Sequence, residues 1–362
     1  MTVDATLSRR ALLGCAGSIL ASARSAAADQ TAFPGGTWAT GPAVPPAAGF
    51  AKVEQALSAL PSTAMMVVQG GRVVWQWGEV AEISYLASAR KSILSMLYGR
   101  AVMDGTIDLD RTVGDIGIND VGGLLPVERT ARVRDLLTAR SGVYHPAGSP
   151  GSDPSTPARG SKQPGTYFFY NNWDFNVAGA VYERLAGRTV FKAFEEDLAE
   201  PLQMQDYDPT RQRMLGFTDQ SAYLAYHFFL SGRDMARLGL LMTRGGQWNG
   251  RQLIPAAWVR DSTSLHVPSA EMSGPFKDGG LGYGYLWWVP ERAEPAWQGA
   301  FLANGNYGQF ILGLPAIDTV VVHRRAVTDA FAVGRNMGTD NTSPSAVSPR
   351  QFLQLVDTLL AP

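Results

Sequence analysis

Strand-forming segments stand at both ends of this chain, with a helical middle between them. Near the start, "AMMVVQGGRVVWQWG" (64–78) has two valine-rich runs around Gly70-Gly71, which predicts a β-hairpin. Past residue 280 the β-prone runs are "LGYGYLWWV", "YGQFILGLP" and "TVVVHRR". We therefore expect an α+β sandwich: one antiparallel sheet built from both termini and flanked by helices, with an inserted all-helical region.

Helical periodicity and its stop signals set the expected boundaries. Helices are expected over 49–60, 88–103 and 349–360, and in the middle over 175–187 and 231–246, where each segment closes on a glycine. The predicted organisation is then an extended lead-in over 29–48, an α/β domain made of 49–95 and 256–362, and a mainly helical insert over 96–255.

The first 28 residues have the order of an export signal. Arg9-Arg10 precede an apolar run from Ala11 to about Ala21, and the small residues Ala26 to Ala28 follow. The paired arginines are typical of the twin-arginine route. Cleavage near Ala28 would remove Cys15, the single cysteine, so we expect an exported (periplasmic or secreted) protein without disulfides.

Composition narrows the class of partner. The chain has 362 residues, is 45% hydrophobic and 17% charged, and has a formal net charge of -1, so nothing indicates nucleic-acid binding. After residue 28, no apolar run approaches the ~18 residues of a membrane span. The four histidines, His145, His227, His266 and His323, lack metal-ligand spacing, so we expect no metal and no cofactor.

The candidate nucleophile lies in "YLASARKSILS" (85–95). Ser88 and Lys91 are three residues apart at the start of a predicted helix, which puts the amine one turn from the hydroxyl. Burial or nearby positive charge must lower the pKa of Lys91 before it can accept a proton. A chance Ser-x-x-Lys pair is expected about one time in three, so an ordinary polar pair at a helix start is the alternative.

A second candidate group is Tyr170-Asn171-Asn172. A tyrosine beside a lysine can deliver a proton to a leaving group, and an amide side chain can position the substrate. The alternative is a packed loop tyrosine. No G-x-S-x-G is present, which excludes the central motif of the α/β-hydrolases.

Together these residues resemble the serine β-lactamase-like superfamily, nearest to the class C β-lactamases and their esterase, peptidase and 6-aminohexanoate-oligomer hydrolase relatives. "ARVRDLLTARSGV", "PGTYFFYNN" and "SGRDMARLGLLMTRGGQWNG" extend the likeness to roughly residues 50–360. The resemblance implies a β-lactamase/transpeptidase-like fold and catalysis through an acyl-enzyme. It implies Ser88 as nucleophile and Lys91 and Tyr170 as a coupled proton-transfer pair, in which the principal base is left open.

The resemblance also implies substrate-positioning groups. Asn172 would orient Lys91 and substrate, and the backbone N–H groups of Ser88 and Asn306 would hold the oxyanion. Where penicillin-recognising members have Lys-Thr-Gly, this chain has Ala303-Asn304-Gly305; Lys277-Asp278-Gly279 is the weaker candidate because it falls in a loop. Asn304 would hydrogen-bond substrate and Gly305 would let the strand approach closely.

Other residues are weaker candidates. Tyr144 and His145, in "SGVYHP", are expected to border the pocket, with an ordinary loop position as the alternative. The aromatic run "GYGYLWW" could line a substrate groove or pack in the core, and His323 is expected to end a strand.

Three functions stay open from the sequence. A carboxylesterase or amide hydrolase is favoured, because Ala303 removes the lysine that would pair with a β-lactam or D-alanyl carboxylate. A β-lactamase or D-Ala-D-Ala carboxypeptidase is the second. A catalytically inactive member that binds cell-wall fragments or a protein is the third, and the presence of Ser88, Lys91 and Tyr170 argues against it. The expected substrate is a small ester, amide or peptide.

Overall fold

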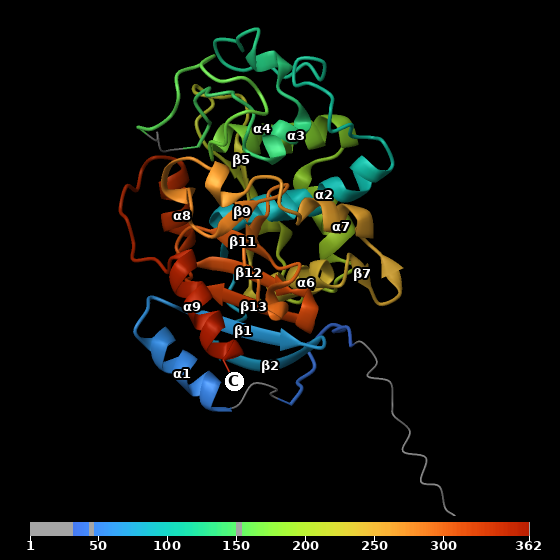
Figure 1. The fold of residues 1–362 in the computed structure, drawn as a ribbon, viewed down its shortest axis with the longest axis vertical. Coiled ribbons are helices and arrows are strands. Elements are labelled where there is room, and N and C mark those ends of the chain that lie inside the picture. Colours follow the sequence, from blue (N-terminus) through green and yellow to red (C-terminus); the bar gives the residue numbers. More distant parts are fainter. Residues whose placement is uncertain (1–31, 43–46, 150–153, 362) are drawn as a thin grey trace, which may run out of the picture. The chain divides into compact units, whose positions relative to one another are not determined.

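A seven-stranded antiparallel sheet takes its strands from both ends of the chain (Figure 1). The computed structural model describes residues 32–42, 47–149 and 154–361. In sheet order the strands are β2 (Arg72–Gly78), β1 (Ala64–Gln69), β13 (Thr319–Arg324), β12 (Gln309–Leu314), β11 (Phe301–Gly305), β10 (Trp288–Pro290) and β9 (Leu281–Tyr283). The predicted hairpin and the predicted fold class are both confirmed.

The pairing of β1 with β13 joins the two ends of the chain. Met66 stands opposite Val322 in an antiparallel register that runs from Ala64 to Gln69. Both strands are nearly continuous apolar runs, a pattern typical of strands covered on both faces. His323 lies in β13 next to its last residue, as expected of a strand end.

Helices cover both faces of this sheet. On one face lie α1 (Ala47–Ser58) and α9 (Pro349–Leu360); Phe50 stacks on Trp75 at 5.2 Å and Phe352 on Phe310 at 4.6 Å (Figure 1). On the other face α6 (Gly232–Thr243) packs against β12 and β13, and α2 (Arg90–Met103) runs beside β11. The sheet is therefore the middle layer of a sandwich.

The remaining helices are α3 (Val133–Leu137), α4 (Asn172–Ala186), α5 (Val190–Phe194), α7 (Ala256–Ser262) and α8 (Asp329–Asn336). The insert is less purely helical than expected. It contains two short strand pairs, β4 (Arg213–Leu215) with β5 (Ala225–His227) and β7 (Gln247–Trp248) with β8 (Arg251–Gln252). A further strand of the insert, β6 (Phe229–Leu230), pairs with β3 (Ser84–Tyr85), which lies before it in the chain. These runs of two or three residues are too short to show a period of two in the sequence.

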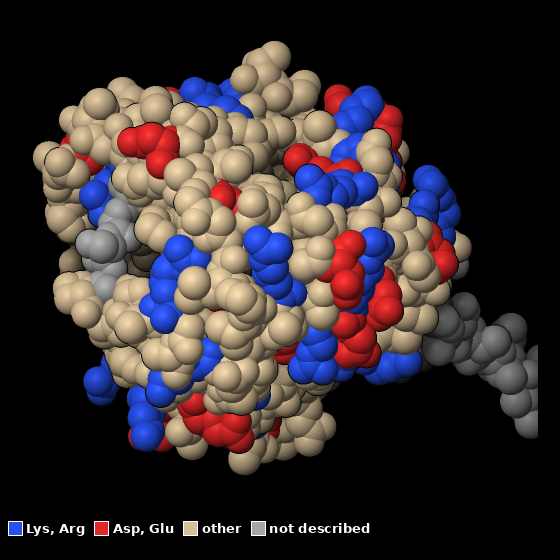
Figure 2. Space-filling view, turned by 90° about the horizontal axis from the view of Figure 1, so that it is seen from above, with Lys and Arg blue, Asp and Glu red and all other residues tan. Residues whose placement is uncertain are grey.

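The lead-in adds to the edge of the sheet. The backbone of Val73 donates to Ala39 and accepts from Gly41, and Thr40 forms a bridge with Val73. The expected signal segment over 1–28 lies outside the described residues, as does part of 29–48. Within the described residues no helix has the length and apolar character needed to cross a bilayer. Lysine, arginine and acidic side chains are interspersed on the face seen in Figure 2.

The contact of α6 with the sheet depends on Gly239. A Cβ placed there would lie 2.5 Å from Val320 and 2.8 Å from Ile311, closer than packed carbon atoms allow. We expect Gly239→Ala to lower the free energy of unfolding by about 1–3 kcal/mol, because overpacking of two β-branched side chains outweighs the helix propensity of alanine. Urea unfolding measures the loss. In a double-mutant cycle, Gly239→Ala should cost less in the Val320→Ala background than in the wild type, and equal costs in the two backgrounds would contradict this packing.

Candidate active site

Ser88 is held in a strained turn at the start of α2. It lies in a single turn of 3-10 helix, Ala87–Ala89, that runs directly into α2. Ala87 adopts a φ of +48°, a conformation that costs a non-glycine residue free energy and that clusters at functional sites. The helix after it is buried on nearly every side, from Arg90 through Gly99. The turn therefore presents Ser88 from a rigid support.

Lys91 reaches both other members of the predicted catalytic group. Its Nζ lies 2.7 Å from Ser88 Oγ and 3.0 Å from Tyr170 Oη. Lys91 is 2% exposed, and burial together with the positive charge of Arg90 lowers its pKa well below the ordinary value. The amine can thus be neutral and able to accept the proton of Ser88, as the sequence argument required.

Tyr170 stands between Lys91 and a wall of aromatic rings. Its ring centroid lies 4.7 Å from that of Phe175 and 5.5 Å from those of Phe276 and Trp288. Burial among these rings raises the pKa of Tyr170 to about 12, although the hydrogen bond with Ser88 opposes the shift. Tyr170 therefore keeps its proton at neutral pH and can donate it.

The helix α4 fixes Tyr170 from behind. Asn171 caps this helix, accepting a hydrogen bond from the backbone of Asp174 at 3.0 Å, and Phe169 donates its backbone N–H to Ala139. Tyr170 is thus held between a capped helix and a backbone hydrogen bond. This local order comes from the Asn-Asn pair that follows the tyrosine in the sequence.

The strand β11 passes directly over the turn that carries Ser88. A Cβ added at Gly305 would lie 2.3 Å from the carbonyl oxygen of Leu86 and 2.9 Å from the amide nitrogen of Ala89, so only glycine fits. Asn306 follows the strand and lines a cavity of about 90 Å³ together with Ser88. The backbones that were predicted to form the oxyanion site therefore border the same space.

The other two asparagines differ in position. Asn172 lines the cavity of Ser88, but it makes no hydrogen bond to Lys91 in the described structure. No direct contact therefore supports the prediction that Asn172 orients Lys91. Asn304 lines a neighbouring hollow of about 760 Å³ with Trp288 and Phe276. That hollow adjoins the aromatic wall around Tyr170, since Phe276 and Trp288 belong to both. Lys277, the weaker alternative, follows a 3-10 turn in a loop, as expected.

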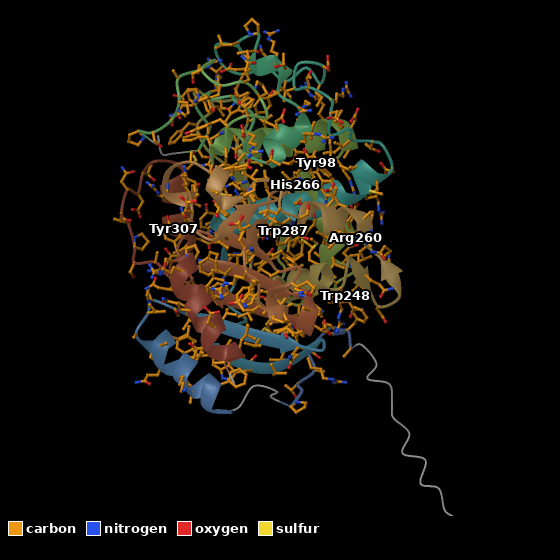
Figure 3. All side chains as sticks on the ribbon, in the orientation of Figure 1. Tyr98, Trp248, Arg260, His266, Trp287 and Tyr307 are labelled. Carbon is orange, nitrogen blue, oxygen red and sulfur yellow. The ribbon has the colours of Figure 1, made fainter. Side chains whose placement is uncertain are left out.

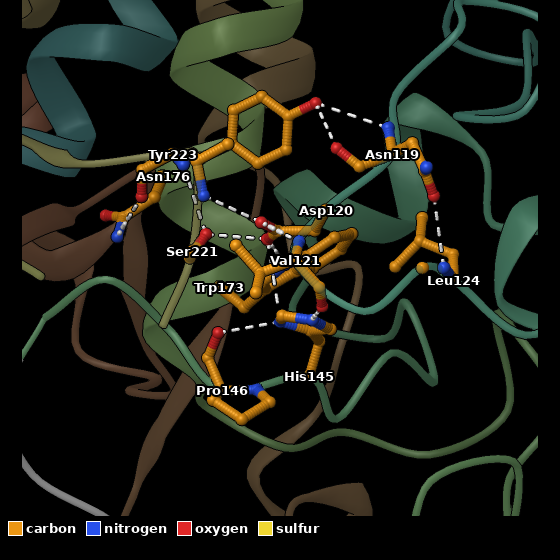
Figure 4. Close-up of polar contacts among 12 residues, drawn as sticks. Asn119, Asp120, Val121, Leu124, His145, Pro146, Trp173, Asn176, Ser221 and Tyr223 are labelled. Carbon is orange, nitrogen blue, oxygen red and sulfur yellow. Dashed lines mark hydrogen bonds and ion pairs between the residues drawn. The ribbon is translucent and has the colours of Figure 1, made fainter. Parts of the chain in front are cut away.

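His145 does not border the cavity of Ser88. It is buried in a polar network shown in Figure 4, where its ring nitrogens bond the carbonyls of Pro146 and Val121 and Nδ1 lies 3.5 Å from Asp120. Asp120 in turn accepts from Trp173 and Ser221. The proline that follows His145 and the buried carboxylate explain why the ring turns inward, and the histidine ties loops together.

Tyr144 was also expected to border the pocket, and it lies elsewhere. It packs edge-on against Phe169 at 5.7 Å, and its buried hydroxyl has no hydrogen-bond partner. Burial, with Asp174 nearby, raises the pKa of Tyr144. It does not line the cavity that contains Ser88. The aromatic run is divided: Trp288 lines the larger hollow, whereas Trp287 packs in the core against Phe301.

Among the cavity residues that were not singled out from the sequence as site residues are three with basic side chains. Arg90, His227 and Arg335 line the space beside Ser88 and come from α2, β5 and α8. Arg90 lies within the Ser-x-x-Lys motif, so the sequence could have pointed to it as a site residue. His227 and Arg335 lie in no recognisable motif, and only the fold brings them to the cavity. Among the described residues, no three potential metal ligands gather at one place.

Comparison with known proteins gives a family match. The model of the Beta-lactamase family matches residues 50–323. A search of curated proteins finds no match.

Several solved structures share the fold. A Bacillus anthracis protein provisionally described as a 6-aminohexanoate-dimer hydrolase has a TM-score of 0.61 at 19% identity, over 85% of this chain and 80% of its own. EstCE1, described as a hydrolase with promiscuous acyltransferase activity, has 0.58 at 19%, over 86% and 98%. A penicillin-binding protein homologue from Caulobacter crescentus has 0.57 at 16%, over 79% and 92%. With the family match spanning most of its length, this chain belongs to the beta-lactamase family of hydrolases.

Proposed function

We propose that this chain is a serine hydrolase that cleaves an ester or amide through an acyl-enzyme. The observation that carries the proposal is the placement of Lys91 Nζ at 2.7 Å from Ser88 Oγ and 3.0 Å from Tyr170 Oη. A buried lysine with a lowered pKa beside a serine hydroxyl is the arrangement that activates a serine nucleophile without histidine.

Each residue has a role in the proposed reaction. Ser88 Oγ attacks the substrate carbonyl while its proton passes to neutral Lys91. The backbone N–H groups of Ser88 and Asn306 stabilise the oxyanion. As the intermediate collapses, Tyr170 gives its proton to the leaving group and recovers one from Lys91. Water then attacks the acyl-enzyme by the same proton path in reverse, releasing the acid and restoring Ser88.

We favour an esterase or amide hydrolase over a β-lactamase or D-Ala-D-Ala carboxypeptidase. Ala303 occupies the position where penicillin-recognising members carry a lysine, and the strand β11 that contains it ends beside Ser88. EstCE1, described as a hydrolase with promiscuous acyltransferase activity, and the Bacillus anthracis protein, provisionally described as a 6-aminohexanoate-dimer hydrolase, show that proteins with such descriptions share this fold. The family match itself keeps β-lactam turnover as the second candidate.

We also propose export through the twin-arginine route, on the strength of Arg9-Arg10 and the apolar run after them. N-terminal sequencing of the exported protein tests this. A mature chain that begins near Asp29 supports the proposal, and retention of Met1 at the N-terminus of the final product contradicts it.

The nucleophile can be tested by substitution. We expect Ser88→Ala to lower ester hydrolysis by at least about 10³-fold, since the acyl-enzyme cannot form. Mature protein is assayed on p-nitrophenyl esters, nitrocefin, D-Ala-D-Ala peptides and short amide oligomers, with phosphonate labelling read by mass spectrometry.

Ser95→Ala is the matched control, because Ser95 lies in the same buried helix and its hydroxyl has no partner. It should keep the activity and the label. Retention of activity in Ser88→Ala, or a label on another serine, would overturn the assignment. Rapid nitrocefin turnover would promote the β-lactamase candidate. No turnover and no label in the wild type would favour the non-catalytic alternative.

The buried amine of Lys91 should leave a signature in stability. Its folded pKa lies below the unfolded value, so between the two values the unfolded chain binds one more proton than the folded chain. Stability must therefore rise with pH through this window, by up to about 1.4 kcal/mol per pH unit. Lys91→Met should remove this slope, and urea unfolding between pH 6 and pH 10 measures it.

The pH dependence of hydrolysis gives a second measure of the pKa of Lys91. Hydrolysis should fall as the pH drops through the folded pKa of Lys91, because the protonated amine cannot accept a proton, while Tyr170 stays protonated up to about pH 12. The control is Lys52→Met, which removes an exposed lysine of α1. Identical pH profiles of stability in the wild type and in Lys91→Met would contradict a neutral lysine.

A further inference from the structure

The cavity beside Ser88 is lined by cationic and neutral polar groups without acidic ones. Among the described residues that line it there is no aspartate or glutamate, whereas Arg90 and Arg335 both do so. A second hollow of about 270 Å³ adjoins it and shares Asn306, Tyr307 and Arg335. Arg335 thus stands where the space next to the nucleophile opens outward.

Arg335 is a guanidinium without a counterion. It lies in the last turn of α8, is partly exposed, and makes no ion pair within the described structure. Asp340 is near enough to be affected electrostatically, but its exposed carboxylate accepts hydrogen bonds from Thr342 instead. Tyr307, which adopts a φ of +74°, lies beside Arg335: burial raises the pKa of its phenol, and the charge of Arg335 and a hydrogen bond with it oppose that rise.

Two buried residues that line the cavity also have polar atoms without hydrogen-bond partners. Arg90 is 3% exposed; its Nη2 donates to Asn176 at 3.2 Å, and its Nη1 has no hydrogen-bond partner. His227 is 2% exposed and neither ring nitrogen is bonded. Buried polar atoms of native proteins are rarely left unpaired, and those that are unpaired call for an explanation. Here both residues line the cavity where a substrate would lie.

We propose that this cavity binds a carboxylate of the substrate, with Arg335 as the direct contact and with Arg90 and His227 behind it. The proposal rests on the proposed hydrolase function and names its substrate class: esters or amides that carry a free carboxylate near the scissile bond. A planar guanidinium pairs with a carboxylate through two parallel hydrogen bonds. Arg335, on α8, thus supplies from another element the cation that Ala303 lacks on β11.

Binding is tested first in a form that needs no catalysis. In the Ser88→Ala background, calorimetry compares glutarate with its neutral counterpart glutaramide. We expect glutarate to bind more tightly, and Arg335→Gln to weaken glutarate by about 10- to 100-fold, as is typical for loss of a charged hydrogen-bond partner. Arg335→Lys should retain part of the affinity. Equal affinity for the two probes, or no loss in Arg335→Gln, overturns the proposal.

Kinetics then place the contact in the reaction. Two matched ester pairs are compared, one with the carboxylate on the acyl side (mono-p-nitrophenyl glutarate against p-nitrophenyl valerate) and one on the leaving group (3-acetoxybenzoate against its methyl ester). For at least one pair, the ratio of kcat/KM for the anionic to the neutral ester should fall about tenfold or more in Arg335→Gln, mainly through KM. Unchanged ratios for both pairs overturn the proposal.

The matched control is Arg260→Gln. Arg260 is an exposed arginine of α7, a helix that lies apart from Tyr307 and α8 (Figure 3). The substitution Arg260→Gln should therefore leave both kcat/KM ratios unchanged.

The hydrolase proposal and the carboxylate proposal would fail in different ways. If the chain is not a hydrolase, the wild type turns over none of the esters but Ser88→Ala still binds glutarate in preference to glutaramide. If only the carboxylate contact is wrong, the wild type hydrolyses esters with ratios that do not depend on Arg335.

Discussion

The burial of α2 is the constraint on which the rest of the site depends. This helix follows directly on the turn that carries the proposed nucleophile Ser88, and it is enclosed by the sheet on one side and by α4, α5 and α7 on others. Burial disfavours the charged form of Lys91, and no acidic side chain pairs with it among the described residues. The packing that stabilises the fold is therefore also what lowers the pKa of Lys91. Loosening the helix would return the amine to water and raise that pKa.

The two walls of the site have opposite characters. Phe175, Phe276 and Trp288 surround Tyr170 with rings and keep its phenol protonated, whereas the opposite wall holds Arg90 and His227 in a polar cavity. Burial lowers the pKa of Lys91 and that of His227, and the charge of Arg90 lowers both further. In the proposed mechanism a proton passes among Ser88, Lys91 and Tyr170 while the space for substrate carries positive charge.

The strands, the main helices and the one-turn spacing of Ser88 and Lys91 could be predicted because each depends on local pattern. Valine runs, helix periodicity and the Asn171 cap all act over a few residues. The place of Tyr170, 79 positions after Lys91, was implied only by the family resemblance. His145 could not be placed, since the direction of its ring depends on Asp120, 25 positions earlier in the chain, and on a network that no local signal reveals. Arg335 escaped notice for the same reason. Its meaning comes from the lack of acidic side chains among the described residues that line the cavity, which only the folded structure shows.

The position of β13 between β1 and β12 has a consequence for the growing chain on the ribosome. Gln69 in β1 bonds Thr319 in β13, 250 positions later, so the first hairpin waits for most of translation before it gains its sheet partner. Ser88, Lys91 and Tyr170 are all made before β11, whose Gly305 closes over the serine turn. A nascent chain that stops short of this strand holds the reactive side chains without the backbone that completes their pocket. The proposed hydrolytic activity would therefore arise only with the last sixth of the chain, long after the proposed nucleophile has been synthesised.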